Sequence, residues 1–181
     1  GTNNITVDPQ LADLSHLSAG SPCRTAGSPD YATGVDIDGE AWANPPSIGC
    51  DEYNSGALTG AVSVAIQTAY TNVPKGFQLQ FTAQIGGRVG TSRWEFGDGT
   101  TVSNQPYASH SWAVAGDYHV LLWAYNENNP DGVWTALTVH VSEPVRHVNL
   151  ANHTPQAPYL SWDTAATNIQ DAVDATMVSG E

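Results

Sequence analysis

The strongest constraint on the fold is a strict alternation of apolar and polar residues. Phe77, Leu79, Phe81, Ala83 and Ile85 alternate with polar residues, as in a β-strand that buries one face. Turn sequences rich in Gly, Pro, Asn and Asp follow about every ten residues, as in many-stranded sandwiches. Further strands are predicted at 62–68, 92–96, 107–112, 118–125 and 133–141. The pattern indicates an all-β fold, with an immunoglobulin-like β-sandwich at residues 60–143.

The two flanks of this sandwich have a different character. Gly and Pro, which number 17 and 11 in the chain, interrupt every short apolar run in residues 1–56, so no helix of useful length is expected there. One short helix is predicted in residues 144–181 from apolar positions three and four residues apart, namely Ile169, Ala172, Val173, Thr176 and Met177. The N-cap candidates are Ser161, Asp163 and Thr164.

The charge of the chain excludes some partners. Eighteen acidic residues against five basic ones give a net charge of −13, and Lys75 is the single lysine. Such a surface cannot neutralise a phosphate backbone, so we expect no nucleic-acid partner and no insertion into membranes. No apolar run approaches the roughly 18 residues of a membrane helix, and the N-terminus lacks the features of a signal peptide. We therefore expect a soluble chain, and we expect any export signal to lie outside it.

One motif carries a family resemblance. Residues 94–100 read Trp-Glu-Phe-Gly-Asp-Gly-Thr, and His-Ser-Trp at 110–112 and Ala-Gly-Asp-Tyr-His-Val at 115–120 follow. This set resembles the PKD (polycystin-type) domain family, whose signature has Asp where this chain has Glu95. We interpret the motif as structural, serving core packing and a tight turn through Trp94, Phe96, Gly97, Asp98 and Gly99.

The flanks resemble a second family. Residues 8–10, 21–23, 36–39 and 48–53 are similar to the closing turns of secreted right-handed parallel β-helix proteins, and residues 159–174 resemble the opening helix of that superfamily. The resemblance implies three parts: a β-helix terminus at 1–56, a PKD sandwich at 60–143 and a β-helix start with its capping helix at 144–181. In this order the two solenoid pieces cannot form one ordinary solenoid. It implies either a piece of a longer surface protein or copies that dock head to tail into a fibre.

Two groups of residues have both a structural and a chemical interpretation. Asp36, Asp38 and Glu40 alternate in a turn-rich stretch, where carboxylates either cap turns or coordinate calcium. Cys23 and Cys50 match no zinc-ligand spacing, so they form either one structural disulfide or two inert thiols.

Exposed aromatic residues and glycosylation acceptors complete the candidate sites. The candidates for stacking on sugar rings are Trp42, Trp123, Tyr125, Trp134 and Trp162, although Trp123 and Trp134 fit burial or an intermodule contact as well. Asn4 and Asn152 occupy Asn-x-Thr acceptor triplets.

No catalytic arrangement is present in the sequence. The histidines show no His-Glu-x-x-His spacing, and the resemblance to β-helix enzymes covers only the ends of that fold, so no catalytic residue carries over. We therefore expect a non-catalytic extracellular structural or adhesive module of a microbial surface protein, secreted or at the cell surface, without a cofactor other than calcium. Its expected partners are copies of itself, arranged head to tail, and polysaccharide. The alternative is a spacer or carbohydrate-binding region of a secreted polysaccharide-degrading enzyme.

Overall fold

The computed structural model describes residues 5–142, 145–157, 159 and 161–175. It divides into two compact units, one made of residues 1–69, 80–109 and 119–137 and the other of residues 70–79, 110–118 and 138–181. The described strands are β1 (Ser63–Thr68), β2 (Asn72–Pro74), β3 (Leu79–Gly86), β4 (Thr91–Glu95), β5 (Thr101–Ser103), β6 (Tyr107–His110), β7 (Gly116–Asn126) and β8 (Asn129–Ser142). The helices are the short 3-10 turns η1 (Pro29–Tyr31) and η2 (Ser55–Ala57), and α1 (Ile169–Asp174).

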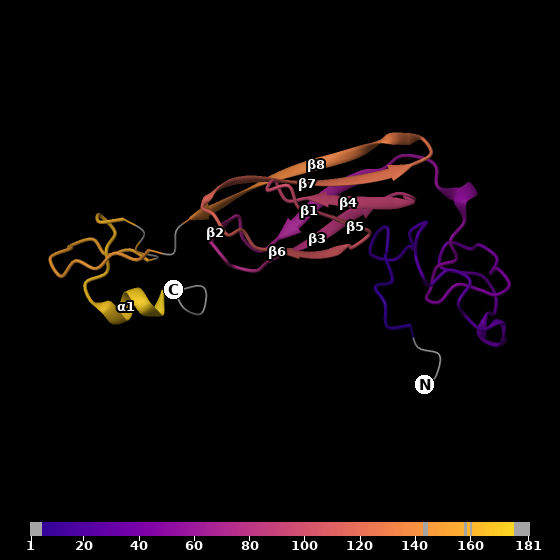
Figure 1. Cartoon of the computed structure of the whole chain (residues 1–181), viewed down its shortest axis with the longest axis horizontal. Coiled ribbons are helices and arrows are strands. Elements are labelled where there is room, and N and C mark those ends of the chain that lie inside the picture. The colour runs from indigo at the N-terminus through magenta and orange to yellow at the C-terminus, as the bar shows by residue number, and fades with distance from the viewer. Residues whose placement is uncertain (1–4, 143–144, 158, 160, 176–181) are drawn as a thin grey trace. The chain divides into compact units, whose positions relative to one another are not determined.

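The strands form two sheets (Figure 1). One has three strands in the order β1-β3-β6, and the other has five in the order β2-β8-β7-β4-β5. β1 pairs antiparallel with β3, and β4 pairs antiparallel with both β5 and β7, while β2 pairs parallel with β8. The sheets confirm a mostly β fold of the sandwich type with one short helix.

The core follows from the alternation in the strands. In β3 every second residue from Leu79 to Ala83 is buried, and in β4 the buried residue of the motif is Trp94. The rings of Phe81 and Trp94 have centroids 5.7 Å apart, and Phe96 lies 5.8 Å from Phe81. Each such buried side chain contributes about 2 kcal/mol by leaving water.

The Gly-Asp-Gly turn has the structural role that the motif predicts. Gly97 and Gly99 adopt φ values of +79° and +91°, which other residues resist. Asp98 Oδ1 accepts hydrogen bonds from the Thr100 backbone N at 3.0 Å and from the Thr100 hydroxyl at 2.6 Å. Trp94 and Phe96 are fully buried, so the motif both fills the core and closes the turn between β4 and β5.

Three predictions about elements are wrong. β2 and β5 were not expected, because each has only three residues and lies in a turn-rich stretch. The N-cap of α1 is Asn168, whose side chain accepts a hydrogen bond from the Asp171 backbone N, whereas Ser161 and Thr164 bond to each other in a preceding turn.

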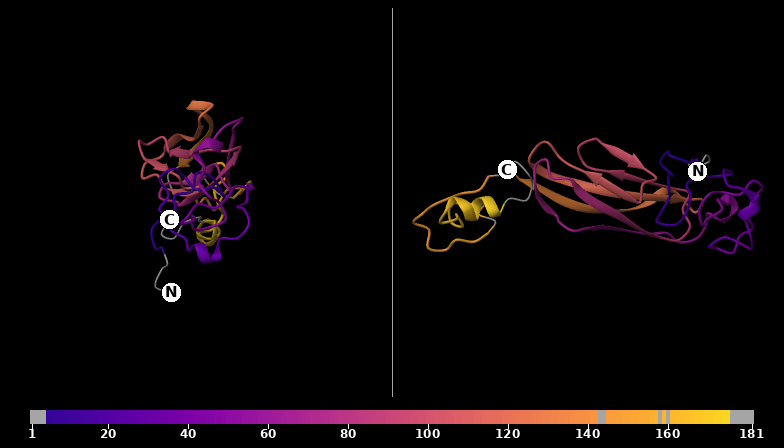
Figure 2. Two further views of the ribbon diagram at one scale, coloured as in Figure 1. Left: turned by 90° about the vertical axis from the view of Figure 1, so that its right-hand side faces the viewer. Right: turned by 90° about the horizontal axis from the view of Figure 1, so that it is seen from below.

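Figure 2 shows α1 beside the loops that precede it in the chain. Thr176 and Met177 lie outside the described residues.

The N-terminal segment packs on the sandwich through a shared apolar contact. Ala12 joins Val89 and Ala124 in one buried cluster, with Val62, Val64 and Ile85 packed around it. The Ala19 backbone N donates to the Gly90 carbonyl at 3.1 Å. This segment is therefore continuous with the end of the sandwich formed by the β3–β4 turn.

The resemblance of the flanks to a parallel β-helix is not confirmed. Residues 5–58 contain no strand, and their two isolated bridges, Leu11 with Leu17 and Val35 with Ala41, are antiparallel. In the described part of the C-terminal segment a single parallel bridge joins Val148 to Ala166. Stacked rungs need neighbouring rungs to pair with, so the relationship to a β-helix stays a prediction. No described helix has the length and apolar character needed to cross a membrane.

The predicted disulfide is not formed. Cys23 and Cys50 are free thiols, the first buried and the second exposed. The Cys50 thiol faces the Ser15 carbonyl at 3.8 Å, while the Cys23 carbonyl accepts from the backbone N of Ile48. The two cysteines thus belong to different local contacts, which agrees with the free-thiol alternative.

We predict that the two glycines of the turn differ in their sensitivity to substitution. A Cβ on Gly99 meets no atom within 4 Å, whereas a Cβ on Gly97 lies 3.0 Å from the backbone N and O of His119. Gly99→Ala should cost about 1 kcal/mol, the cost of the left-handed conformation alone, and Gly97→Ala clearly more. Urea denaturation measures both, and equal losses would contradict this account of the turn.

We also predict that one thiol of the native chain reacts rapidly with a colorimetric disulfide reagent and two react after unfolding. The reason is that Cys50 is exposed and Cys23 is buried. The melting temperature should not change on adding reductant. A lower melting temperature under reductant would show that a bridge forms in solution.

Candidate functional site

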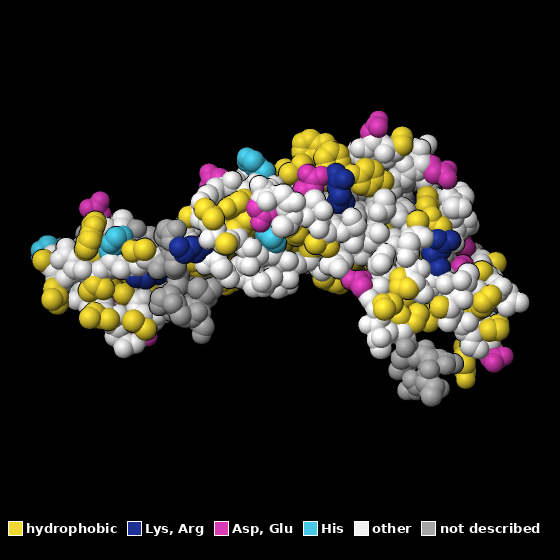
Figure 3. All heavy atoms as spheres, viewed as in Figure 1, with side chains coloured by type: hydrophobic (Ala, Val, Ile, Leu, Met, Phe, Trp, Pro, Cys, Tyr) yellow, Lys and Arg dark blue, Asp and Glu magenta, His cyan; other side chains and the backbone are white. Residues whose placement is uncertain are grey.

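The first candidate site is a cluster of aromatic side chains on the outer face of the five-stranded sheet. In β7 the residues Val120, Leu122 and Ala124 are fully buried, so the alternate positions, including Trp123, face outward. Trp134 on β8 is 54% exposed. Figure 3 shows hydrophobic side chains gathered over β7 and β8, next to basic and acidic ones.

The rings of this cluster contact one another through Trp123. Trp123 and Tyr125 are stacked, with ring centroids 6.3 Å apart and an angle of 11° between the ring planes. Trp123 also contacts Trp134, with ring centroids 5.6 Å apart. Arg93, the cross-strand partner of Trp123, holds its guanidinium 5.9 Å from the Trp123 ring centroid. We call Arg93, Trp123, Tyr125 and Trp134 the aromatic patch.

Two features hold the aromatic patch in place. A Cβ on Gly132 would lie 2.6 Å from Tyr125 Cε1 and 3.0 Å from Trp123 Cε3, so the rings pack directly over this glycine. Arg93 is also paired with Glu95, whose carboxylate balances the charge of the guanidinium. The rings of the patch are therefore packed closely on the sheet, beside a cation that already has a partner.

Trp42 and Trp162, which were also predicted to stack on sugars, are not part of these ring contacts. Trp42 lies in the N-terminal segment. It lines an open pocket of the N-terminal segment together with Tyr31, Pro46 and Ile48. Its indole N–H is buried and has no hydrogen-bond partner among the described residues. Trp42 is thus not part of the aromatic patch.

The predicted calcium ligands are engaged with different groups. Asp36 Oδ1 accepts from the backbone N of Asp38 and Glu40 at 2.9 and 2.7 Å, and its Oδ2 accepts from the Glu52 backbone N at 3.0 Å. Although burial opposes it, these hydrogen bonds lower the pKa of Asp36 below its ordinary value. Asp38 and Glu40 instead form ion pairs with Arg88 at 2.8 and 3.3 Å. Asp36 therefore caps a turn, and the three carboxylates do not converge as the predicted site requires.

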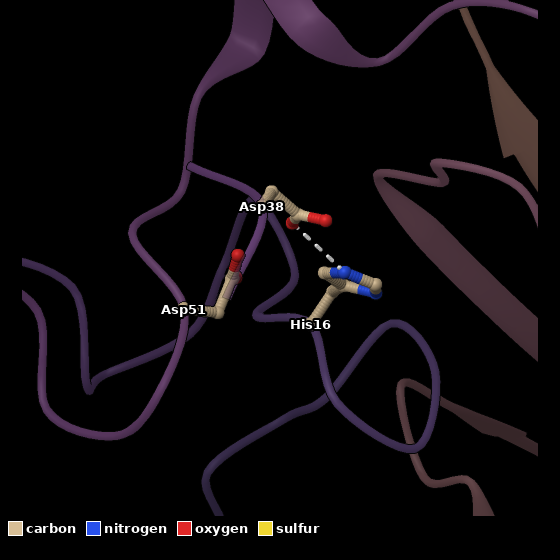
Figure 4. Close-up of side chains that lie close together, drawn as sticks. All are labelled: His16, Asp38 and Asp51. Carbon is tan, nitrogen blue, oxygen red and sulfur yellow. Dashed lines mark ion pairs between the residues drawn. The ribbon is translucent and has the colours of Figure 1, made fainter. Parts of the chain in front are cut away.

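A second candidate site surrounds Asp38 and includes His16 and Asp51 (Figure 4). His16 Nδ1 lies 2.7 Å from Asp13 Oδ2, and His16 Nε2 lies 3.0 Å from Asp38 Oδ2. Asp51 comes from a third loop, and its Oδ2 accepts from the Leu17 backbone N at 2.7 Å. We call Asp13, His16, Asp38, Asp51 and Arg88 the polar cluster. It joins three loops of the N-terminal segment to the β3–β4 turn.

The charges in the polar cluster influence one another. The hydrogen bond to Asp13 raises the pKa of His16 against the effect of burial. Burial raises the pKa of Asp51 above its ordinary value. Burial alone would lower the pKa of Arg88, but its hydrogen bond to Glu40 and the nearby carboxylates raise it. The carboxylates next to His16 thus stabilise its protonated form relative to that of a free imidazole.

Sequence reasoning did not predict the polar cluster. Asp38 appeared as a calcium candidate, but His16, Asp51 and Arg88 were not joined to it. They lie far apart in the chain, and no spacing pattern relates them. The local signal that was available is the short Asp13–His16 turn, in which Asp13 Oδ1 also accepts from the backbone N of Ser15 and His16.

The predicted glycosylation acceptors have different outcomes. Asn4 lies outside the described residues. The Asn152 amide nitrogen donates to the carbonyls of Asp163 and Ala165 at 3.2 and 2.6 Å, and its oxygen accepts from the Thr154 backbone N. A glycan on Asn152 would have to replace these hydrogen bonds, and its attachment stays a prediction.

The comparison with solved structures matches PKD domains from two Vibrio species. The chain is 20% identical to the PKD1 domain of Vibrio anguillarum Epp, covering 47% of this chain and 98% of that one with a TM-score of 0.39. The PKD1 domain of the Vibrio cholerae metalloprotease PrtV is 19% identical, with coverages of 45% and 98% and a TM-score of 0.38.

A carbohydrate-binding module from the β-sandwich superfamily is 16% identical, with a TM-score of 0.43. The alignment covers 53% of this chain and spans only 39% of that protein. The comparison with curated proteins finds no match.

The family model of the PKD domain matches residues 63–141. The matched region contains the motif at 94–99, the two sheets and the aromatic patch, and it agrees with the resemblance drawn from the motif. Residues 63–141 are a PKD domain.

Proposed function

We propose that this chain is a non-catalytic, extracellular adhesive or accessory module whose aromatic patch binds a neutral polysaccharide. The observation that carries the proposal is the contiguous group of rings formed by Tyr125, Trp123 and Trp134. PKD domains are non-catalytic modules and are typically extracellular, which supports the setting of the proposal. The module would serve a microbial surface protein or stand beside the catalytic domain of a secreted polysaccharide-degrading enzyme.

The shape of the patch favours a sugar chain. Flat aromatic rings present an apolar face and bind the C–H faces of sugars, and a row of rings can contact successive sugar units. Rings fixed over Gly132 lose little conformational freedom on binding. This packing of the rings of the aromatic patch therefore supports the binding of an extended ligand.

Charge decides which polysaccharide fits best. The chain has a net charge of −13, which repels polyanionic glycans at a distance. The cation nearest the rings, Arg93, is already paired with Glu95. A neutral polysaccharide avoids both costs, and neighbouring polar strand residues can hydrogen-bond its hydroxyl groups.

We expect Trp134→Ala to weaken retardation of the chain in gels that contain soluble neutral polysaccharides by about tenfold or more, since loss of an aromatic anchor costs about 1.4 kcal/mol or more. Affinity electrophoresis over a series of neutral and acidic glycans measures this. Trp162→Ala is the matched control, because Trp162 is 67% exposed but lies outside the aromatic patch. A Trp134→Ala chain that is retarded like the unmodified chain would refute the proposal.

Head-to-tail assembly is a second candidate function, favoured by apolar side chains exposed on the flanks. In α1, Ala172 is buried while Ile169 and Val173 are 73% and 51% exposed, so the described part of the chain leaves these two apolar side chains largely uncovered. In the N-terminal segment Tyr31 and Val35 are 87% and 57% exposed. Exposed apolar groups of this kind commonly mark surfaces of association, and joining unlike ends of successive copies builds an open fibre.

For assembly we expect the average sedimentation coefficient to rise with protein concentration, and to rise further in high salt because salt screens the repulsion between acidic copies. The variant Ile169→Ser with Val173→Ser should abolish this rise. Val114→Ser, at a residue that is 67% exposed and outside the flanks, should not. A chain that stays monomeric throughout in sedimentation velocity would rule out the fibre.

A further inference from the structure

The polar cluster contains a histidine whose ring is held in place by a buried carboxylate. Asp13 holds His16 through Nδ1, with contacts of 2.7 and 2.9 Å, and also accepts from the His16 backbone N at 2.9 Å. Asp13 is itself buried. A carboxylate on one ring nitrogen fixes the orientation of the ring and leaves the other nitrogen available as a ligand. That other nitrogen, Nε2, is buried and makes no hydrogen bond of good geometry among the described residues, although Asp38 Oδ2 lies 3.0 Å away.

The second observation comes from Asp51. This residue is only 2% exposed. One of its carboxylate oxygens accepts from the Leu17 backbone N, but the other, Oδ1, is buried and has no hydrogen-bond partner in the described part of the chain. A buried carboxylate oxygen without a partner carries an uncompensated desolvation cost. A bound cation would remove that cost.

These groups converge. One ligand atom each from His16, Asp38 and Asp51 lie within 4.8 Å of one another. Figure 4 shows the three side chains directed toward a common region from three separate loops. We propose that His16, Asp38 and Asp51 bind a divalent transition-metal ion of the zinc type.

The donor set selects the class of metal. An imidazole nitrogen with two carboxylates suits Zn²⁺, Co²⁺ or Mn²⁺, whereas Ca²⁺ takes six or more oxygen ligands. Three protein ligands leave room for water in the coordination shell. The site thus differs from the calcium site predicted at Asp36, Asp38 and Glu40, with which it shares only Asp38.

Arg88 is compatible with a bound cation. It is paired with Asp38 at 2.8 Å and with Glu40 at 3.3 Å. The carboxylates of Asp13, Asp38, Glu40 and Asp51 carry up to four negative charges, against three positive charges on one guanidinium and one divalent ion. An ion bound by His16, Asp38 and Asp51 would still leave Arg88 paired with Glu40.

The position of the site suggests what the ion does. Its ligands come from three loops of the N-terminal segment, and Arg88 connects them to the β3–β4 turn of the PKD domain. The ion would link these loops and stabilise the attachment of the segment to the domain. This role does not depend on polysaccharide binding or on assembly.

The test uses the full 181-residue chain, stripped with chelator and titrated with Co²⁺. We expect one equivalent to produce a visible ligand-field absorption, Zn²⁺ to displace it, and Zn²⁺ to raise the melting temperature. His16→Ala and Asp51→Asn should each weaken Co²⁺ binding at least tenfold. His153→Ala, which removes an exposed histidine of the C-terminal segment, should leave it within twofold.

Two further measurements make the outcome decisive. Long-range proton–nitrogen spectra of the imidazole groups report directly whether His16 Nε2 binds Zn²⁺ in the unmodified chain, so a variant that fails to fold does not block the test. Excess Ca²⁺ should not displace Co²⁺. Absence of saturable Co²⁺ and Zn²⁺ binding, binding that persists unchanged in both variants, or displacement by Ca²⁺ would overturn the assignment.

Discussion

The packing of Phe81 against Trp94 and Phe96 is the contact on which the other features depend. It joins the two sheets, since β3 belongs to one and β4 to the other, and it sets which face of each strand points inward. A shift by one residue would move these rings into water and expose the opposite set. Because Trp94 points inward, its neighbours Arg93 and Glu95 point outward, and Arg93 meets Trp123 on the adjacent strand. The aromatic patch is thus a consequence of how the core is filled.

A different kind of contact organises the N-terminal segment internally. Its carboxylates accept backbone N–H groups. Asp36 accepts three of them, and Glu52 accepts those of Ala43 and Ser47 together with the Ser47 hydroxyl. Buried acceptors of this kind substitute for the missing sheet ladders. They explain why so acidic a segment can be ordered without strands.

Local patterns were sufficient to predict the sandwich but not the sites. Period-two alternation located the longer strands, and the motif at 94–99 predicted both the core positions and the turn at Gly97. β2 was missed because it pairs in parallel with β8, a contact between residues far apart in the chain. Trp123 faces outward because its neighbours Leu122 and Ala124 are buried. The alternation of apolar and polar residues in the sequence suggested this position only in part.

The polar cluster shows the limit of such reasoning more clearly. Asp36, Asp38 and Glu40 look equivalent in the sequence, yet backbone N–H groups occupy the first and Arg88 pairs with the other two. Which carboxylate faces His16 depends on loop closure rather than spacing. In the same way, Cys23 and Cys50 lie at a plausible separation in the chain, but the loops leave one inside and one at the surface.

The apolar contact of Ala12 with Val89 and Ala124 bears on how such a module can be moved between proteins. A recombination boundary drawn at the edges of the family match would uncover Val89 and deprive Arg88 of the carboxylates it pairs with. The unit that can be transferred between proteins therefore includes the loops that precede β1. A protein that received the sandwich without these loops would have to supply other residues to cover Val89 and to pair with Arg88.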